Sequence, residues 1–324
     1  MSAKGRSIWV VVLAGGDGPR VRALTTDARG VSTPTQYCSL DGGRSLLQTA
    51  LRRALAITSR EYIVTVVAEA HRPWWEHEFP ALSRSRVVVE PCNRGTGLGV
   101  LLPLLVIAKS DPEAGVVFIP SDHYVEHEDL LAEYLREATA PEVMDGDKLT
   151  LLGMPAIAPD SGFGYLSPAP DSGVGMRPVL EFVEKPHQTL AAELIRAGSV
   201  WNSGIIAGRI SQFLELYLHD SREMFLMLRS IVAQWPDSRT PSAELLAWYA
   251  RRPAFDFSSD VLQKFPRRLQ FLNVPLNLVT VVDRAAFKRG PSPASMIKSS
   301  HAQFGQASFV PIARSPRLSP YDES

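Results

Sequence analysis

Residues Ile8 to Arg20 read IWVVVLAGGDGPR, and this stretch decides how the fold is interpreted. Its first seven residues, Ile8 to Ala14, form a short apolar run rich in β-branched side chains, which is typical of a parallel strand covered on both faces. Glycines occupy three of the next four positions. Glycine permits a tight turn and lets backbone N–H groups approach an anion closely. The stretch therefore predicts a buried strand that ends in an anion-binding loop, to which Arg20 could add a charge-assisted contact.

The spacing of these glycines distinguishes the loop from two common nucleotide-binding motifs. A dinucleotide-binding motif has GxGxxG leading into a helix and an acid about 20 residues further on. Here residues 15–18 read GGDG, and Asp41 lies in a turn-like LDGG. A P-loop requires a Lys followed by Ser or Thr, and the loop has neither at the required place. The spacing therefore disfavours a NAD-dependent dehydrogenase and a P-loop enzyme, and it leaves a plain strand-ending turn open as the alternative.

Beyond the first strand, short apolar runs alternate with helical patterns, which indicates a largely parallel sheet. Before Pro141 the expected strands are residues 62–67, 86–89 and 115–119, and the expected helices are 45–57, 97–109 and 126–138. After Pro141 the expected strands lie closer together, which indicates a mixed-sheet extension. They are residues 149–152, 164–167, 179–183, 269–274 and 278–282, with helices at 189–197, 210–218, 222–234 and 242–250.

Length and composition bound the organisation of the chain. Its 324 residues fit one large α/β domain with an appendage. We expect an N-terminal tail at 1–7 and a domain at 8–289, divided into halves at 8–140 and 141–289. Residues 290–324 are rich in Ser and Pro and predict a flexible tail.

Charge and cysteine content exclude several classes of protein. Lys and Arg together number 34, and Asp and Glu together also number 34, so the formal net charge is +0. The chain therefore has no overall field that attracts nucleic acid or anionic lipid. Cys38 and Cys92 lie far apart and fit neither a zinc spacing nor a disulfide framework. The apolar run at 8–14 is too short for a membrane span or a signal sequence. We therefore expect a cytoplasmic protein that binds neither nucleic acid nor a membrane.

Nine motifs, taken in order, resemble one enzyme family. They are LAGGDGPR (13–20), PTQY (34–37), LDGGRSLLQTALRR (40–53), EPCNRGTGLGVLLPL (90–104), IPSDHYV (119–125), GFGYL (162–166), FVEKP (182–186), VWNSGI (200–205) and AFDFSSDVL (254–262). Each match alone is weak, but nine in the same order are specific. The chain thus resembles the sugar-1-phosphate nucleotidyltransferases from about residue 8 to residue 284, and among them most closely the mannose-1-phosphate guanylyltransferases.

The resemblance implies a fold and a reaction. The implied fold is a Rossmann-like (GT-A-like) α/β nucleotidyltransferase with three layers and a mixed, mainly parallel central sheet, without a C-terminal β-helix domain. In the implied reaction an oxygen of a sugar 1-phosphate attacks the α-phosphorus of a nucleoside triphosphate and releases pyrophosphate. GTP and mannose 1-phosphate are the expected substrates and partners, and the chain could form a homo-oligomer. Because two polyanions must meet, Mg²⁺ is the expected cofactor.

The resemblance assigns nucleotide binding to two segments. The first is the glycine-rich loop, with Leu13, Ala14, Gly15, Gly16, Gly18 and Arg20. The second is Arg94, Gly95 and Thr96, which match the family's base-reading and ribose-reading stretch. For Thr96, the cap of the following helix is an alternative role.

Two acids match the metal ligands of the family. Asp122 follows the expected strand at 115–119, so its carboxylate should lie at the C-terminal edge of the sheet, where ligands bind. Asp122 also matches a nucleotide-binding position, and a helix N-cap is its alternative role. Counting from the VP dipeptide at 274–275 places the second metal acid at Asp283, for which a surface turn acid beside Arg284 is the alternative.

A third group of residues matches the sugar-phosphate site of the family. Lys185 would hold the sugar phosphate, and Glu184 and Asn202 would accept sugar hydroxyls. Gly164 would let backbone amides contact the ligand. A solvated lysine at a strand end is the alternative for Lys185. The expected catalytic residues are Arg20, Asp122 and Lys185.

Two departures from the family pattern fall on the phosphate side of the site. The family's PKQF is PTQY here, so Thr35 replaces a lysine that neutralises the triphosphate. Pro19 replaces a residue with a backbone donor in the loop. Losing a charge-assisted phosphate contact costs about 1.5–3 kcal/mol. Slower turnover, a relocated cation such as Arg22 or Arg29, and an inactive relative that binds a nucleotide sugar are the three possible consequences.

Overall fold

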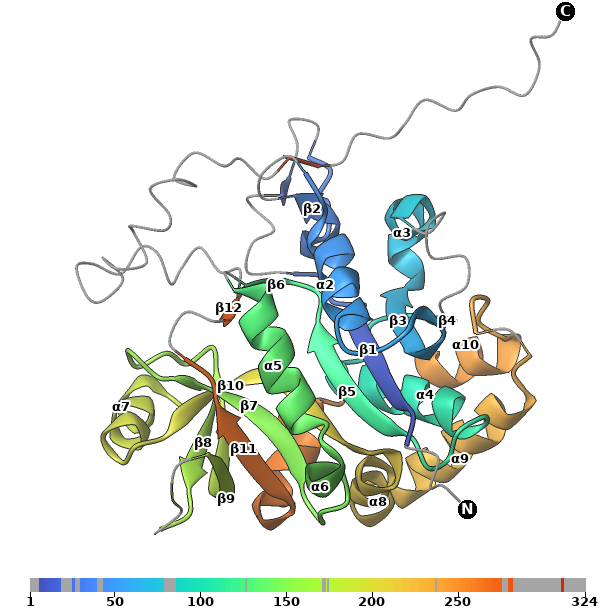
Figure 1. The fold of residues 1–324 in the computed structure, drawn as a ribbon. Helices are drawn as coiled ribbons and strands as arrows, with labels where there is room; N and C mark the ends of the chain where they lie inside the picture. The colour runs from blue at the N-terminus through green and yellow to red at the C-terminus, as the bar shows by residue number, and fades with distance from the viewer. Residues whose placement is uncertain are drawn as a thin grey trace, which may run out of the picture.

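A nine-stranded sheet with helices on both faces forms the core (Figure 1). The computed structural model describes residues 6–18, 25–26, 30–39, 43–78, 86–125, 127–170, 173, 175–236, 238–275, 279–281 and 310–311. The strands of the sheet are β1 (Ile8–Ala14), β3 (Ile63–Ala68), β4 (Arg86–Glu90), β5 (Gly115–Pro120), β7 (Leu149–Pro155), β8 (Gly164–Pro168), β9 (Met176–Glu184), β10 (Val200–Arg209) and β11 (Leu269–Asn273). The helices are α2 (Leu46–Leu55), α3 (Arg72–Glu78), α4 (Thr96–Ala108), α5 (Glu128–Ala138), α6 (Pro141–Met144), α7 (Gln188–Arg196), α8 (Ile210–Asp220), α9 (Arg222–Gln234) and α10 (Ala243–Ala250).

The first strand shows why its sequence has no polar face. Val10 and Val12 of β1 belong to the hydrophobic cluster that includes residues of α2, α3 and α5. Trp9 and Val11 belong to the cluster on the other face, with residues of α4, α8, α9 and α10. Because side chains alternate across a strand, helices cover both faces of β1. The prediction of a buried first strand is confirmed.

The sheet is mixed, as expected, with the order β4-β3-β1-β5-β10-β7-β11-β9-β8. Parallel pairs join β4, β3, β1 and β5, and also β7 and β11. Strand β10 is antiparallel to β5, β7 and β8, and β9 is antiparallel to β8 and β11. The parallel pairing expected for the first half of the chain and the mixed pairing expected after Pro141 are both confirmed, whereas the described sheet as a whole is not mainly parallel. The connection from β8 to β9 is too short for a parallel crossover, so these neighbours pair as a hairpin.

Strand β10 is the main element that the sequence did not predict. Its motif VWNSGI contains Asn, Ser and Gly in succession, which is a turn signal. In the structure the register with β7 shifts between Asn202 and Ile206, and Gly204 has a φ of 78°. The strand therefore continues through a bulge. This irregularity lets its start pair with β8 and its end pair with β5.

Short elements lie outside the main sheet. Strand β6 (His123–Val125) pairs with β12 (Val279–Val281), and β2 (Cys38–Ser39) pairs with β13 (Val310–Pro311). Within the described residues no helix is long and apolar enough to cross a membrane.

One edge of the sheet gathers the segments that carry the sequence motifs. Strands β1 and β5 are parallel neighbours, so the loops that follow them lie together. The backbone N–H and the hydroxyl of Ser121, just after β5, both donate to the carbonyl oxygen of Leu13, at 3.1 and 2.6 Å. A Cβ on Gly204 of β10 would lie 3.3 Å from Cγ of Pro120. The glycine-rich loop, residues 121–122 and the bulge of β10 are therefore adjacent.

Candidate active site

Gln36 supports the glycine-rich loop. Its buried side-chain Nε2 donates to the carbonyl oxygens of Ala14 at 2.8 Å and Gly16 at 3.0 Å. Both bonds use carbonyl oxygens, so Gln36 holds the loop without occupying its amide N–H groups. Amide donors in such a loop are suited to bind phosphate oxygens. The sequence motif PTQY contained Gln36, but nothing in its spacing indicated this contact.

Thr35 lies directly against the glycine-rich loop at Gly18. Thr35 is 2% exposed, and its Oγ1 has no hydrogen-bond partner within the described part of the chain. Gly18 has a φ of 56°, and a Cβ at this position would collide with Thr35 Oγ1. The position that carries lysine in the family pattern is therefore adjacent to the loop, and here it carries a small neutral side chain. Arg20, Arg22 and Arg29 lie outside the described residues.

A chain of polar contacts ties the loop to the strands beside it. Asp17 of the loop accepts from Asn93 Nδ2 at 3.1 Å, and its Oδ1 lies 3.2 Å from Nε2 of His71. Nδ1 of His71 lies 3.4 Å from Gln36 Nε2. Burial lowers the pKa of His71, and the nearby Asp17 opposes this shift. Neither His71 nor Asp17 was predicted, because the contacts join residues 35 or more positions apart and follow no sequence spacing.

Glu90 is a buried carboxyl group behind the loop. A Cβ on Gly15 would lie 2.8 Å from Glu90 Oε2, and one on Gly99 of α4 would lie 3.3 Å from the same atom. Burial raises the pKa of Glu90 to about 8, and the hydroxyl of Tyr249, 3.5 Å from Oε1, partly opposes the shift. The sequence placed Glu90 in a motif but assigned it no role.

The stretch from Arg94 to Thr96 is held by segments from later in the chain. The Arg94 guanidinium donates to the carbonyl oxygens of Tyr249 and Ala250 at the end of α10, at 3.0 and 3.2 Å. Gly95 precedes α4 as its N-cap, with a φ of 87°. Thr96 is the first helical residue, so the alternative that Thr96 caps this helix is wrong. Base reading by Arg94 stays a prediction, because its side chain has a structural contact here.

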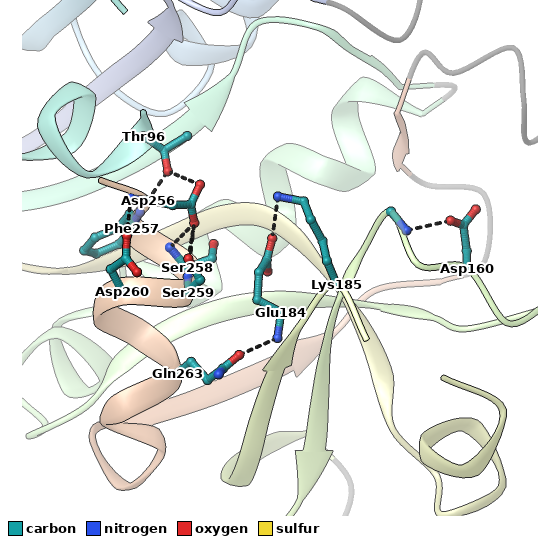
Figure 2. Close-up of polar contacts among 11 residues, drawn as sticks. Thr96, Asp160, Glu184, Lys185, Asp256, Phe257, Ser258, Ser259, Asp260 and Gln263 are labelled. Carbon is teal, nitrogen blue, oxygen red and sulfur yellow. Dashed lines mark hydrogen bonds and ion pairs between the residues drawn. The ribbon is translucent and has the colours of Figure 1, made fainter. Parts of the chain in front are cut away.

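Residues 256–263 contact both the segment expected to bind nucleotide and the segment expected to bind the sugar phosphate (Figure 2). Thr96 Oγ1 donates to Asp256 Oδ2 at 2.9 Å and accepts from the N–H of Phe257 at 2.9 Å. At the other end of the segment, Gln263 Oε1 accepts from the N–H of Glu184 at 2.7 Å. The motif AFDFSSDVL and the Gln263 that follows it thus contact two of the expected binding segments, one at Thr96 and one at Glu184.

Asp122 follows β5 at the edge where the loops gather. Its side chain is half-buried and has no hydrogen bond or ion pair with another residue that the structure describes. Helix α5 begins at Glu128 with His127 as its N-cap, so the helix-cap alternative for Asp122 is wrong. The neighbouring His123 is buried, and burial lowers its pKa to about 4. The second expected metal acid, Asp283, lies outside the described residues.

Lys185 and Glu184 form an ion pair at the end of β9. Lys185 Nζ lies 3.0 Å from Glu184 Oε1, and the Lys185 side chain is 50% exposed whereas that of Glu184 is 11% exposed (Figure 2). Lys185 has a φ of 48°, a conformation that residues other than glycine rarely adopt and that clusters at functional sites. Its N–H donates to the carbonyl oxygen of Phe163 at 3.1 Å, which holds this conformation.

The remaining sugar-site residues lie on the strands next to this pair. Gly164 of β8 is paired with Glu184 across the β8–β9 ladder, and a Cβ on Gly164 would collide with Glu184 Oε2. Asn202 Oδ1 accepts from the N–H of Gly204 at 3.0 Å in the bulge of β10. The ring of Trp201 stacks on Phe163 with centroids 4.5 Å apart. The structure therefore places Gly164 and Glu184 in contact and puts Asn202 near the end of β5.

Comparison with known proteins identifies the family. The family model described as nucleotidyl transferase matches residues 9–238. The alginate biosynthesis protein AlgA of Pseudomonas syringae pv. tomato is 32% identical over 65% of this chain and 43% of its own length. A mannose-1-phosphate guanylyltransferase of Salmonella montevideo is 29% identical over 64% of this chain and 44% of its own length. The chain thus spans less than half the length of these two relatives.

A solved structure agrees with this assignment. The protein from Thermus thermophilus described as mannose-1-phosphate geranyltransferase superposes with a TM-score of 0.69 at 25% identity, covering 85% of this chain and 75% of that protein. The match of the family model extends over more than half of the chain, from β1 to just beyond α9. The chain therefore belongs to the nucleotidyl transferase family.

Proposed function

We propose that the chain transfers a nucleotidyl group from a nucleoside triphosphate to a sugar 1-phosphate and releases pyrophosphate. GTP and mannose 1-phosphate are the proposed substrates, in line with the name of the Salmonella relative. The observation that carries the proposal is the position of Asp122. Its carboxylate has no hydrogen bond or ion pair within the described residues and follows β5, which lies between β1 with the glycine-rich loop and β10 with Asn202.

Mg²⁺ is the proposed cofactor, and the donor set near Asp122 fits it. Mg²⁺ binds proteins through one or two carboxylates and completes its coordination with waters and substrate phosphates. Within the described residues no three His, Cys, Asp or Glu side chains converge on a metal position, so phosphate oxygens would supply the other ligands. Asp122 would hold the ion, which would neutralise charge on the phosphates.

The chain's own residues supply binding and orientation in this reaction. Amides of the glycine-rich loop are proposed to bind the triphosphate, because Gln36 holds the loop through its carbonyl oxygens only. Lys185 is proposed to bind the sugar phosphate, with its ammonium group released from Glu184 as the phosphate arrives. Glu184 would then accept sugar hydroxyls. Positioning two anionic substrates in line is the largest contribution that a protein makes to phosphoryl-type transfer.

An assay of pyrophosphate release tests the proposal. The purified chain is incubated with Mg²⁺, GTP and mannose 1-phosphate, and then with the other nucleoside triphosphates and sugar 1-phosphates in turn. We expect release that requires both substrates, highest with the proposed pair. If no pair of substrates gives release above a blank, the proposal is wrong.

A catalytically weak nucleotide-sugar-binding protein is the second candidate function. It is favoured by Thr35, which places a neutral buried side chain where the family pattern has a lysine, and by the acidic Asp17 in the loop. Calorimetry with GDP-mannose distinguishes the two candidates. Binding without turnover supports the second candidate, and turnover with the proposed substrates excludes it.

Substituting Gly18 with alanine is expected to raise the KM for the nucleoside triphosphate by about tenfold or more, with a smaller effect on kcat. The added methyl group would collide with Thr35 and would force a non-glycine residue to a φ of 56°, which costs about 1–2 kcal/mol. Gly173→Ala is the matched control, because a Cβ there meets nothing within 4 Å. Equal KM values for both variants would show that the loop does not bind the triphosphate.

Substituting Lys185 with methionine is expected to raise the KM for the sugar 1-phosphate by roughly 10–100-fold, since a hydrogen bond to a charged group contributes about 1.5–3 kcal/mol. Lys148→Met is the control. Lys148 pairs with the exposed Asp147 before the start of β7 and is not one of the candidate site residues. Steady-state kinetics with each substrate varied in turn measures the effect. If only the KM for the nucleoside triphosphate rises, then Lys185 binds the nucleoside triphosphate and not the sugar 1-phosphate.

A further inference from the structure

A groove beside β6 is lined by arginines that the proposed reaction does not use. It has a volume of about 790 Å³ and lies between α2, β6 and the start of α5. Clefts of about 300–1,000 Å³ are typical of small-molecule sites. None of the residues that line it belongs to the candidate active site, although His123 of the groove directly follows Asp122 in sequence.

Two arginines on the wall of this groove are unpaired among the described residues. Arg44 precedes α2 and Arg52 lies near its end, and both are exposed and line the groove. Neither forms an ion pair or a side-chain hydrogen bond with any residue of the described ranges. They line the same groove about two helical turns apart along α2, roughly 12 Å at 1.5 Å per residue, which two arginine side chains can span to contact one ligand. Unpaired guanidinium groups in a cleft are suited to bind phosphate bidentately.

A third arginine that lines the groove is held in place by an ion pair. Arg53 is almost fully buried and bonds to Glu128 through two contacts, Nε to Oε2 at 2.9 Å and Nη2 to Oε1 at 2.8 Å. This fork joins α2 to α5 across the groove. Because the charge of Arg53 is matched by Glu128, the charge available to a ligand comes from Arg44 and Arg52.

One residue that lines the groove has a buried polar atom without a partner in the described part of the chain. His123 is 4% exposed and lines the groove, and its Nδ1 has no hydrogen-bond partner within the ranges that the structure describes. A buried polar atom without a partner is unfavourable. Thr49 and Asp129 add a hydroxyl and an exposed carboxylate to the lining. A ligand with hydroxyl groups could bond to these acceptors while its phosphate contacts the arginines.

We infer that this groove is a second binding site, separate from the candidate active site, for the phosphate monoester of a sugar. The phosphate binds Arg44 and Arg52, and the sugar hydroxyls bond to the exposed carboxylate of Asp129. The inference concerns binding alone and does not depend on the proposed function.

Calorimetry on the full chain without Mg²⁺ or nucleotide tests the site. The probe is glucose 6-phosphate, which has no phosphate at C1 and therefore lacks the reacting group of the proposed substrate. We expect a dissociation constant on the order of 1 mM or tighter. Glucose should not bind, and inorganic phosphate should bind more weakly than glucose 6-phosphate. Phosphate and ester of equal affinity would show that the sugar is not recognised and would overturn the inference.

Variants locate the bound probe. The double variant Arg44→Ala/Arg52→Ala should lose at least roughly tenfold in affinity, whereas Arg267→Ala, which removes an exposed arginine outside the groove, should bind as the parent does. Lys185→Met should also bind as the parent does. Loss of binding in Lys185→Met with binding retained in the double variant would place the probe in the candidate active site and overturn the inference. Absence of binding to the parent chain at 10 mM, roughly ten times the expected dissociation constant, would do the same.

Discussion

Substituting Asp122 with asparagine is expected to lower kcat of nucleotidyl transfer by roughly 10²–10³-fold while leaving the fold intact. Removing one group that stabilises charge in a transition state typically has an effect of this size. Asparagine keeps the shape of the side chain and removes the negative charge that would hold Mg²⁺ beside the phosphates. The loss should appear in kcat measured with both substrates saturating, because the charge is needed at the reacting phosphate.

The structure indicates why stability should not change in this variant. Asp122 is half-buried and has no partner among the described residues, so the substitution breaks no ion pair or hydrogen bond that the structure shows. Asp147→Asn serves as a control for the removal of a negative charge, because Asp147 is exposed and lies at the opposite edge of the sheet. Thermal unfolding and turnover are measured on both variants. Full activity in Asp122→Asn would exclude Asp122 from the site.

The position of Asp122 shows what sequence reasoning can achieve. A β-branched run followed by glycines identified β1 and its loop, and a second run followed by an acid identified β5. In parallel strands the carboxyl ends share one edge, so two local patterns predicted one common location. Gly164 and Glu184 were grouped by the resemblance to the family rather than by strand geometry, and the structure pairs them across the antiparallel β8–β9 ladder.

Other parts of the site depend on contacts that no local pattern records. The bulge in β10 looks like a turn in the sequence, and only pairing with β5, β7 and β8 makes it a strand. Gln36 and His71 act on the glycine-rich loop from positions 20 and more residues away. The Arg94 guanidinium contacts the end of α10, a helix more than 140 residues further on, which no local pattern indicated, and its role in base reading stays a prediction. Tertiary packing, rather than residue type, decided each of these cases.

Glu90 is the residue for which tertiary packing has the largest expected effect on stability. In the folded chain burial raises its pKa to about 8, from an ordinary value of 4.5. Between these pH values the folded state holds a proton that the unfolded state has released. The free energy of unfolding should therefore fall as the pH rises from about 4.5 to about 8, by up to about 1.4 kcal/mol per pH unit. Above that range both states are ionised, and the dependence on this group ends.

Substituting Glu90 with glutamine should remove this pH dependence, because glutamine keeps the shape and carries no charge at any pH. Its amide oxygen can still accept from the Tyr249 hydroxyl, as Oε1 of Glu90 does at 3.5 Å. We expect the free energy of unfolding of the variant to equal that of the parent chain near pH 5 and to exceed it by several kcal/mol near pH 8. Denaturant unfolding at pH 5, 6.5 and 8 measures the difference.

The control separates the buried carboxyl from a general effect of charge. Glu181 is exposed on β9, so Glu181→Gln removes the same negative charge without removing a buried group. This variant should follow the pH dependence of the parent chain. If the curves of Glu90→Gln and the parent chain run parallel from pH 5 to pH 8, then Glu90 is ionised in the folded state across that range. The carboxylate behind the glycine-rich loop would then be charged at neutral pH, and the loop would bind the triphosphate against a negative charge that only a cation could offset.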